Sequence, residues 1–205
     1  MYIKLGKIRL HIGMAFAVFF ALAANSLGGH FFVLTFIFSF LHEITHLVCL
    51  FYCGCKNAEL DFYPGGIKLK AEGFSMLSYD KTVLCTLSAP VMNIFAGTVF
   101  YSLGKFFPVS LFYEMSSVNF VIGTGNLLPL PFLDGGRALN AFLLKYLDIL
   151  KVRKICDICA FFTLLFLIVL FFITLMRGKY YLFLLFFFVY CTVGCFCDKR
   201  GVSVT

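Results

Sequence analysis

The chain carries two histidines four residues apart with a glutamate between them, in the run His42-Glu43-Ile44-Thr45-His46. On a helix, residues i and i+4 share one face, so both imidazoles can bind a single metal ion. A glutamate directly after the first histidine is the usual base that activates a water molecule. The residue types and their spacing therefore predict metal-dependent hydrolysis, with His42 and His46 as ligands and Glu43 as the catalytic base.

The segment around this motif is apolar enough to cross a membrane. Residues 31–53 are almost entirely apolar, and about 20 such residues span a bilayer as a helix. Ionisable side chains are costly at membrane depth, so their presence there indicates a functional site. We therefore expect the active site to lie below the membrane surface.

The composition of the whole chain is that of a polytopic membrane protein. Hydrophobic residues make up 61% of the 205 residues and charged residues only 13%, far outside the usual range of soluble proteins. We predict an all-α membrane protein with about six transmembrane helices, in a single membrane-embedded domain (residues 1–205) with no appended soluble domain. The six apolar segments are about 10–27, 31–53, 82–104, 110–130, 155–176 and 180–197.

The basic residues are distributed very unevenly over the segments that connect these six spans. If the N-terminus is cytoplasmic, 14 of the 17 lysine and arginine residues fall on the cytoplasmic side. Positively charged loops stay in the cytoplasm, so we predict a multi-pass cell-membrane protein with both termini cytoplasmic. The same asymmetry accounts for the net charge of +7, and the sequence therefore predicts no nucleic-acid partner.

The loop after the second span, residues 56–79, contains a small predicted β-hairpin. Apolar residues alternate on both sides of a Pro64-Gly65-Gly66 turn, namely Leu60 and Phe62 before it and Ile67, Leu69 and Ala71 after it. This pattern is typical of two strands joined by a glycine-rich turn. An isolated hairpin is only marginally stable in water, so we expect it to rest on the helices or the membrane surface. It either covers the site or offers an edge strand to an extended substrate.

A catalytic zinc site needs a third protein ligand beside the two histidines. The acids near the apolar segments are Asp61, Glu72, Glu114 and Asp134. Glu114 falls near the outer end of its span, and Asp61 and Glu72 belong to the hairpin, where we expect them to be solvated. Asp134 follows a segment that two prolines interrupt at the level of His46, and the next two residues are glycines that allow close backbone approach. We predict Asp134 as the third ligand; the alternative is an aspartate that caps a helix after an exit turn.

The nine cysteines do not form an obvious site in the sequence. Most lie in or beside apolar runs, and six are expected to act as small hydrophobic residues: Cys49, Cys85, Cys156, Cys159, Cys191 and Cys195. The odd number of cysteines argues against a disulfide framework.

These motifs resemble those of the site-2 protease family of intramembrane zinc metalloproteases. The resemblance rests on His42-Glu43-x-x-His46 within a span and on Asn126-x-x-Pro129-x-x-x-x-Asp134-Gly135. A further element, Ser88-Ala-Pro90-x-x-Asn93, matches a third motif of the family, and the six-span layout is similar to the sporulation-type branch. The resemblance covers nearly the whole chain and implies Zn²⁺ as cofactor. It also implies that Asn93 and Asn126 contact the substrate backbone or the oxyanion; the alternative role for both is interhelical hydrogen bonding.

The resemblance further implies a proteolytic function on membrane-associated protein substrates. The expected reaction is hydrolysis of a peptide bond within or beside a membrane-associated segment of a regulatory protein, such as a transcription factor, an anti-sigma factor or a pro-sigma factor. The sequence leaves open whether a regulatory membrane partner or a homo-oligomer is also involved. The alternative function is a metal-ion or proton transporter, but no second set of acids or histidines forms a path across the membrane.

Overall fold

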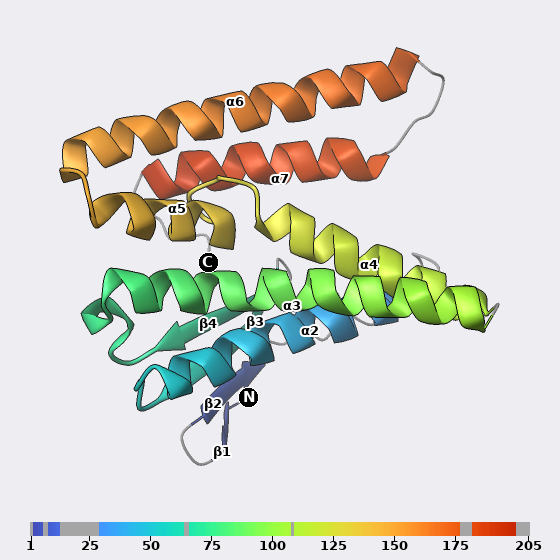
Figure 1. The fold of residues 1–205 in the computed structure, drawn as a ribbon, viewed down its shortest axis with the longest axis horizontal. Helices are drawn as coiled ribbons and strands as arrows, with labels where there is room; N and C mark the ends of the chain where they lie inside the picture. The colour runs from blue at the N-terminus through green and yellow to red at the C-terminus, as the bar shows by residue number, and fades with distance from the viewer. Residues whose placement is uncertain are drawn as a thin grey trace. The chain divides into compact units, whose positions relative to one another are not determined.

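The structure is a computed structural model that describes residues 2–5, 8–12, 29–63, 66–107, 109–176 and 182–199. The chain divides into two compact units, residues 1–126 and residues 127–204. The strands of the first unit are β1 Tyr2–Leu5, β2 Ile8–Ile12, β3 Ala58–Tyr63 and β4 Gly66–Ala71. Its helices are α2 Gly29–Tyr52, the short 3₁₀ turn η1 Phe74–Met76, α3 Tyr79–Phe106 and α4 Ser110–Asn126. The helices of the second unit are α5 Asp134–Leu144, α6 Ile149–Met176 and α7 Leu182–Lys199 (Figure 1).

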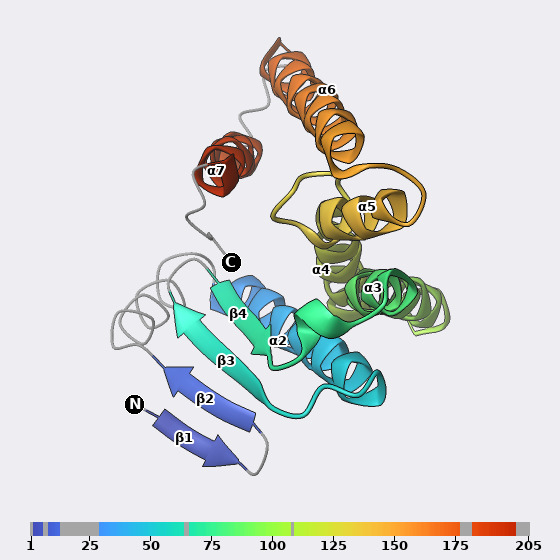
Figure 2. The same cartoon turned by 90° about the vertical axis from the view of Figure 1, so that its left-hand side faces the viewer.

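The predicted hairpin is confirmed as strands β3 and β4. Leu60 lies opposite Leu69 and Phe62 lies opposite Ile67, and residues directly opposite each other share one face of a sheet. The apolar residues therefore line one face, as their alternation indicates. Figure 2 shows the four strands side by side, in the order β1-β2-β3-β4, with α2 next to β4.

The apolar face of the sheet rests on helix α2, as expected for a hairpin that cannot stand alone. The ring of Phe62 lies 6.0 Å from that of Phe40, and Leu69 packs against a buried cluster that includes Leu50. The other face carries two exposed ion pairs, Arg9–Glu59 at 3.1 Å and Lys70–Asp61 at 3.3 Å. Exposed ion pairs contribute at most about 1 kcal/mol each to folding. Apolar packing is therefore the main contact between the sheet and helix α2.

The N-terminal strands β1 and β2 were not predicted from the sequence, and they correct part of the first proposed span. Residues 10–12, assigned to that span, form the end of β2, and residues 13–27 lie outside the described residues. Apolar residues alternate with polar ones over Ile8–Ile12, which is a strand pattern. Parallel pairing with β3 sets Leu10 opposite Leu60. The hairpin is thus half of a four-stranded sheet in a mostly helical chain.

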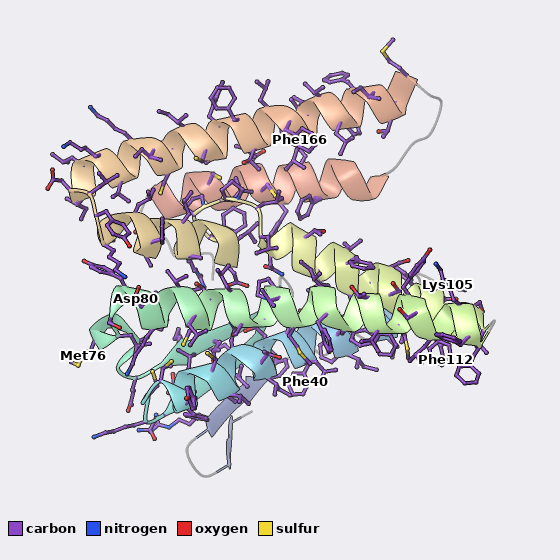
Figure 3. All side chains as sticks on the ribbon, viewed as in Figure 1. Phe40, Met76, Asp80, Lys105, Phe112 and Phe166 are labelled. Carbon is purple, nitrogen blue, oxygen red and sulfur yellow. The ribbon has the colours of Figure 1, made fainter. Side chains whose placement is uncertain are left out.

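Five of the six predicted apolar segments coincide with helices α2, α3, α4, α6 and α7. Three described helices are long and apolar enough to cross a membrane: His30–Tyr52, Tyr79–Phe106 and Ile149–Met176. Helix α6 exposes apolar rings along its length; Figure 3 labels Phe166, which is 62% exposed. Such a surface is unfavourable in water and fits contact with lipid. The number of six transmembrane helices stays a prediction.

The second unit has its own core, which anchors the turn that precedes helix α5. Leu130, Phe132 and Leu133 of this turn are buried against residues of α6 and α7, among them Leu167 and Cys191. The predicted break after the fourth span is confirmed, because α4 ends at Asn126 and residues 127–133 are irregular. Helix α5 itself was not predicted, and Asp134 is its first residue.

Helix α2 ends in a tight turn that directs the chain into the sheet. Gly54 has φ 106°, a left-handed conformation that side chains disfavour, and the N–H of Cys55 donates to the carbonyl of Leu50 at 3.0 Å. Burial raises the pKa of the Cys55 thiol, and the neighbouring Cys53 raises it further. The positive charge of Lys81 lowers this pKa, but by less. The Cys55 thiol is therefore protonated at neutral pH.

Candidate metal centre

The His-Glu-x-x-His motif lies on helix α2, as predicted, with both imidazoles buried. His42 is 5% exposed and His46 is 8% exposed, and the two rings lie nearly perpendicular with their centroids 4.8 Å apart. One ring nitrogen of each lies within 4.8 Å of the other. Glu43, the next residue along the helix, is half-buried. The pair is therefore close enough for one ion to take both imidazoles.

A backbone carbonyl determines the tautomer of His46. Its Nδ1 lies 2.8 Å from the carbonyl oxygen of Cys85 on helix α3, and a carbonyl oxygen can only accept. Nδ1 must therefore carry the hydrogen, which leaves the lone pair on Nε2. An imidazole held through one nitrogen presents the other to a metal in a defined direction.

The tautomer of His42 is determined by a relay of two buried asparagines. His42 Nδ1 lies 2.6 Å from Asn93 Oδ1, Asn93 Nδ2 donates to Asn119 Oδ1 at 2.9 Å, and Asn119 Nδ2 donates to the carbonyl of Met115 at 2.8 Å. That carbonyl only accepts, so it sets the orientation of Asn119, then that of Asn93, and finally the protonated nitrogen of His42. The lone pair of His42 is again on Nε2.

Small residues let helices α3 and α4 approach closely enough for this relay. A Cβ atom on Gly123 would lie 3.0 Å from the carbonyl oxygen of Pro90 and 3.2 Å from Asn93 Cβ, so a larger residue would separate the helices. Nearby, the hydroxyl of Ser116 donates to the carbonyl of Gly97 at 2.8 Å. Small residues and interhelical hydrogen bonds are the usual means by which membrane helices pack.

The structure shows the hydrogen bonds of the two predicted asparagines, Asn93 and Asn126, and brings in two groups that were not predicted from the sequence. Asn93 makes interhelical hydrogen bonds to His42 and Asn119, which is the alternative role given for it above. Asn126, at the end of α4, donates to the carbonyl of Ile122 at 3.0 Å. Asn119 and the carbonyl of Cys85 were not predicted. For Asn119 a signal was available, because an amide side chain within an apolar segment indicates a hydrogen-bonding role.

Three of the four candidate acids belong to the first unit and have other partners there. Asp61 pairs with Lys70, Glu72 accepts a hydrogen bond from Asn57 at 2.6 Å, and Glu114 lies 3.0 Å from His30. His30 precedes His42 by twelve residues on α2, which is about 18 Å along a helix. Glu114 is therefore far from the histidine pair.

Asp134, the fourth candidate acid, lies in the second unit at the start of helix α5 and is 8% exposed. The two glycines after it allow the preceding turn to fold back on the helix, as predicted. A Cβ atom on Gly135 would overlap the carbonyl group of Leu127, and one on Gly136 would overlap that of Leu130. The turn, buried through Leu130, therefore holds Asp134 in a defined place within this unit.

The donors of the first unit fit a zinc ion. A histidine that binds zinc through one ring nitrogen usually hydrogen-bonds through the other, and the Nδ1 atoms of His42 and His46 are engaged in this way. Burial keeps competing water away from them. The arrangement is suited to hold a Lewis-acidic ion beside Glu43, which can accept a proton from water.

We expect Asn119→Leu to weaken zinc binding by about 10–100-fold, because loss of a group that orients a ligand has effects of this size. Without Asn119, the amide of Asn93 and the imidazole of His42 lose their fixed orientation. Competitive zinc titration of the purified protein measures the change. Ser116→Ala is the matched control, since it removes a buried hydrogen bond from the same helix pair outside the relay; equal losses in both variants would contradict the relay.

The profile of peptidase family M50 matches residues 67–170, about half of the chain. The chain belongs to peptidase family M50. The range matched in this M50 member contains Asn93, Asn126 and Asp134, and the histidine pair precedes it.

The M50 chain is similar to two proteins from Methanocaldococcus jannaschii. A zinc metalloprotease of that organism is 29% identical over 130 residues, which are 60% of this chain and 37% of the relative. The chain thus matches little more than a third of the length of this curated relative. A solved site-2 protease from the same organism has a TM-score of 0.65 at 20% identity, covering 100% of this chain and 96% of that one. The M50 chain therefore has the fold of a site-2 protease.

Proposed function

We propose that this chain is an intramembrane zinc metalloprotease of the site-2 type. The observation that carries the proposal is the pair of buried imidazoles on an apolar, membrane-length helix, each held through Nδ1 by an oxygen atom of helix α3. Membership of family M50 and the similarity to a protein named zinc metalloprotease support both the activity and zinc as the cofactor.

Asp134 is the third zinc ligand in this proposal. Asp61, Glu72 and Glu114 have other partners in the first unit, whereas Asp134 is a buried carboxylate at the end of an anchored turn. The proposal also includes a single membrane-embedded protease domain over residues 1–205. The similarity of the whole chain to one solved site-2 protease supports a single domain.

Each residue of the proposed site has its own role in peptide-bond hydrolysis. His42, His46 and Asp134 would hold the ion, which would supply Lewis acidity for the scissile carbonyl and for the attacking water near neutral pH. The Glu43 carboxylate accepts the proton of the attacking water and then donates it to the leaving amine. Asn93 and the carbonyl of Cys85 keep the imidazoles oriented. Asn126, at the end of α4, contacts the substrate backbone.

The substrate is a membrane-associated protein segment that is extended at the cleavage site. A transmembrane helix satisfies its own backbone hydrogen bonds, so it must unwind before its scissile carbonyl is accessible. Strand β4, at the edge of the described sheet, offers main-chain groups that pair with such an unwound segment. The regulatory targets named above and the sporulation-type branch belong to this proposal.

We expect a zinc chelator to abolish cleavage of a membrane-embedded model substrate by the purified protein. Added Zn²⁺ restores cleavage and Mg²⁺ does not, because imidazole ligands favour zinc whereas Mg²⁺ prefers oxygen ligands. Gel analysis of the cleavage products measures both steps. Cleavage that persists at full rate in the metal-free protein would contradict a zinc protease.

We further propose that both termini and the loop of residues 56–79 are cytoplasmic, from the positions of the basic residues. A phosphatase reporter that is active only outside the cytoplasm should be inactive when fused after Thr205 or within this loop. The matched control is a fusion after Phe107, between α3 and α4, which should be active. An active reporter at Thr205 would overturn the orientation.

A further inference from the structure

Three cysteine thiols gather where the C-terminal part of α2 meets the N-terminal part of α3. The Sγ atoms of Cys49, Cys53 and Cys85 all lie within 4.8 Å of one another, and the thiol of Cys85 lies 3.4 Å from Cys53 Sγ. Cys53 is 6% exposed and Cys85 is 2% exposed, while Cys49 is half-buried. Sequence analysis treated Cys49 and Cys85 only as small hydrophobic residues, because their proximity depends on the packing of two helices.

The spacing of Cys49 on α2 and of Cys53, the first residue after it, continues that of the histidines, because the N–H of Cys53 still donates to the carbonyl of Cys49 at 2.9 Å. His42, His46, Cys49 and Cys53 follow each other at intervals of four, three and four residues, which keeps them on one face of a helix. The first pair provides nitrogen donors and the second provides sulfur donors. Helix α3 approaches both pairs with one residue, because Cys85 contributes its thiol to the sulfur cluster and its carbonyl to His46.

The separations of the three sulfurs fit a shared metal ion. Two thiolates on one tetrahedral zinc, with Zn–S bonds of about 2.3 Å, lie roughly 3.8 Å apart. Here Cys53 Sγ and Cys85 Sγ lie 3.4 Å apart, and all three sulfurs lie within 4.8 Å of one another, which is compatible with that value. A disulfide would use only two of the three thiols and requires the sulfurs to approach to about 2.05 Å.

One basic side chain lies near the cluster. Lys81 donates from Nζ to the carbonyl of Cys53 at 3.2 Å, so a positive charge lies beside the cluster. Three thiolates around a divalent ion leave one net negative charge, which this ammonium group offsets. Cys191 and Cys195 of the second unit are also buried, yet no third metal-binding side chain joins them within the part of the chain that the structure describes.

We propose that Cys49, Cys53 and Cys85 bind one thiophilic metal ion of the Zn²⁺ class, separate from the ion at His42 and His46. Three thiolates select soft metals over Mg²⁺ and Ca²⁺. The bound ion links α2 to α3 next to the Cys85 carbonyl that orients His46. The site does not depend on the chain being a protease.

Cobalt substitution tests the proposal, because a thiolate ligand gives Co²⁺ an intense charge-transfer absorption in the near ultraviolet and imidazole and carboxylate ligands do not. The full-length protein loaded with Co²⁺ should show this band, and in His46→Ala, which lacks a ligand of the other site, the band should saturate at one Co²⁺ per chain. Cys49→Ser and Cys85→Ser should each lose most of the band. Cys191→Ser, at another buried cysteine, and His46→Ala should keep it.

A second measurement on the native sequence applies even if the serine variants do not fold. With Cd²⁺ as the probe, Cys49, Cys53 and Cys85 should be protected together from alkylation in the detergent-solubilised protein, as read by mass spectrometry, while Cys156 and Cys159 react as before. Absence of the cobalt band, or protection that does not distinguish the three cysteines, would overturn the site. Either result would leave the proposed protease intact, and loss of proteolysis in His46→Ala with the band retained would separate the two sites.

Discussion

Replacing Glu43 by glutamine reduces proteolysis by at least about 100-fold while zinc remains bound, because general-base catalysis contributes about 10²–10⁴-fold. Glutamine has the size of glutamate and can still hydrogen-bond, but it cannot accept the proton of the attacking water. Glu43 follows His42 by one residue and is rotated by about 100° from it around the helix. In the proposed mechanism it can therefore meet the attacking water without sharing the ligand direction of the two imidazoles.

The expected signature of Glu43→Gln is an inactive protein that still folds, binds zinc and retains uncut substrate. Co-expression with single-span substrates measures cleavage, and elemental analysis of the purified variant measures zinc. Glu72→Gln is the matched control, because Glu72 lies next to the hairpin and bonds to Asn57. Its cleavage rate should stay near that of the native chain. Near-normal cleavage by Glu43→Gln would show that this motif does not carry out hydrolysis.

The parts of the fold that sequence analysis predicted are those with a strong periodic signal. Residues 31–53 and 155–176 are long apolar runs and form α2 and α6. The alternation around Pro64-Gly65-Gly66 predicted the hairpin and its apolar face, although Gly66, assigned to the turn, is the first residue of β4. The N-terminal strands were missed because the lysines and arginine of residues 1–9 resemble the basic flank of a span. Their pairing with β3 depends on residues about 50 positions later, which no local pattern reports.

At the site, too, the residues within one helical turn were predicted from the sequence, whereas their partners on other helices were not. His42, Glu43 and His46 are recognisable because their chemistry is encoded in one helical turn. The partners of the imidazoles come from two other helices: the carbonyl of Cys85, and Asn119 through Asn93. A backbone carbonyl has no sequence signature, and an asparagine in an apolar segment indicates a hydrogen bond without naming its partner. The tautomers of the two histidines therefore required the structure.

Asp134→Asn should abolish both tight zinc binding and cleavage. Asparagine has the size and nearly the helix propensity of aspartate, so we expect the variant to keep α5 and the turn before it and to lose the charged ligand. A neutral amide is a poor ligand for zinc. Because even the loss of groups that only orient ligands lowers affinity 10–100-fold, we expect the loss of a direct ligand to exceed about 100-fold.

Asp61→Asn is the matched control for Asp134→Asn, since it also neutralises an aspartate, but one on the hairpin that forms a partly exposed pair with Lys70. Such a pair contributes at most about 1 kcal/mol to folding, so zinc content and cleavage should not change. The midpoint temperature of thermal unfolding of both metal-free variants should equal that of the metal-free native chain. This comparison distinguishes the loss of a zinc ligand from the loss of the fold. Full zinc retention by Asp134→Asn, together with zinc loss by Asp61→Asn, would move the third ligand to the hairpin. Zinc loss confined to Asp134→Asn would assign a carboxylate of the second unit to the imidazole pair of the first.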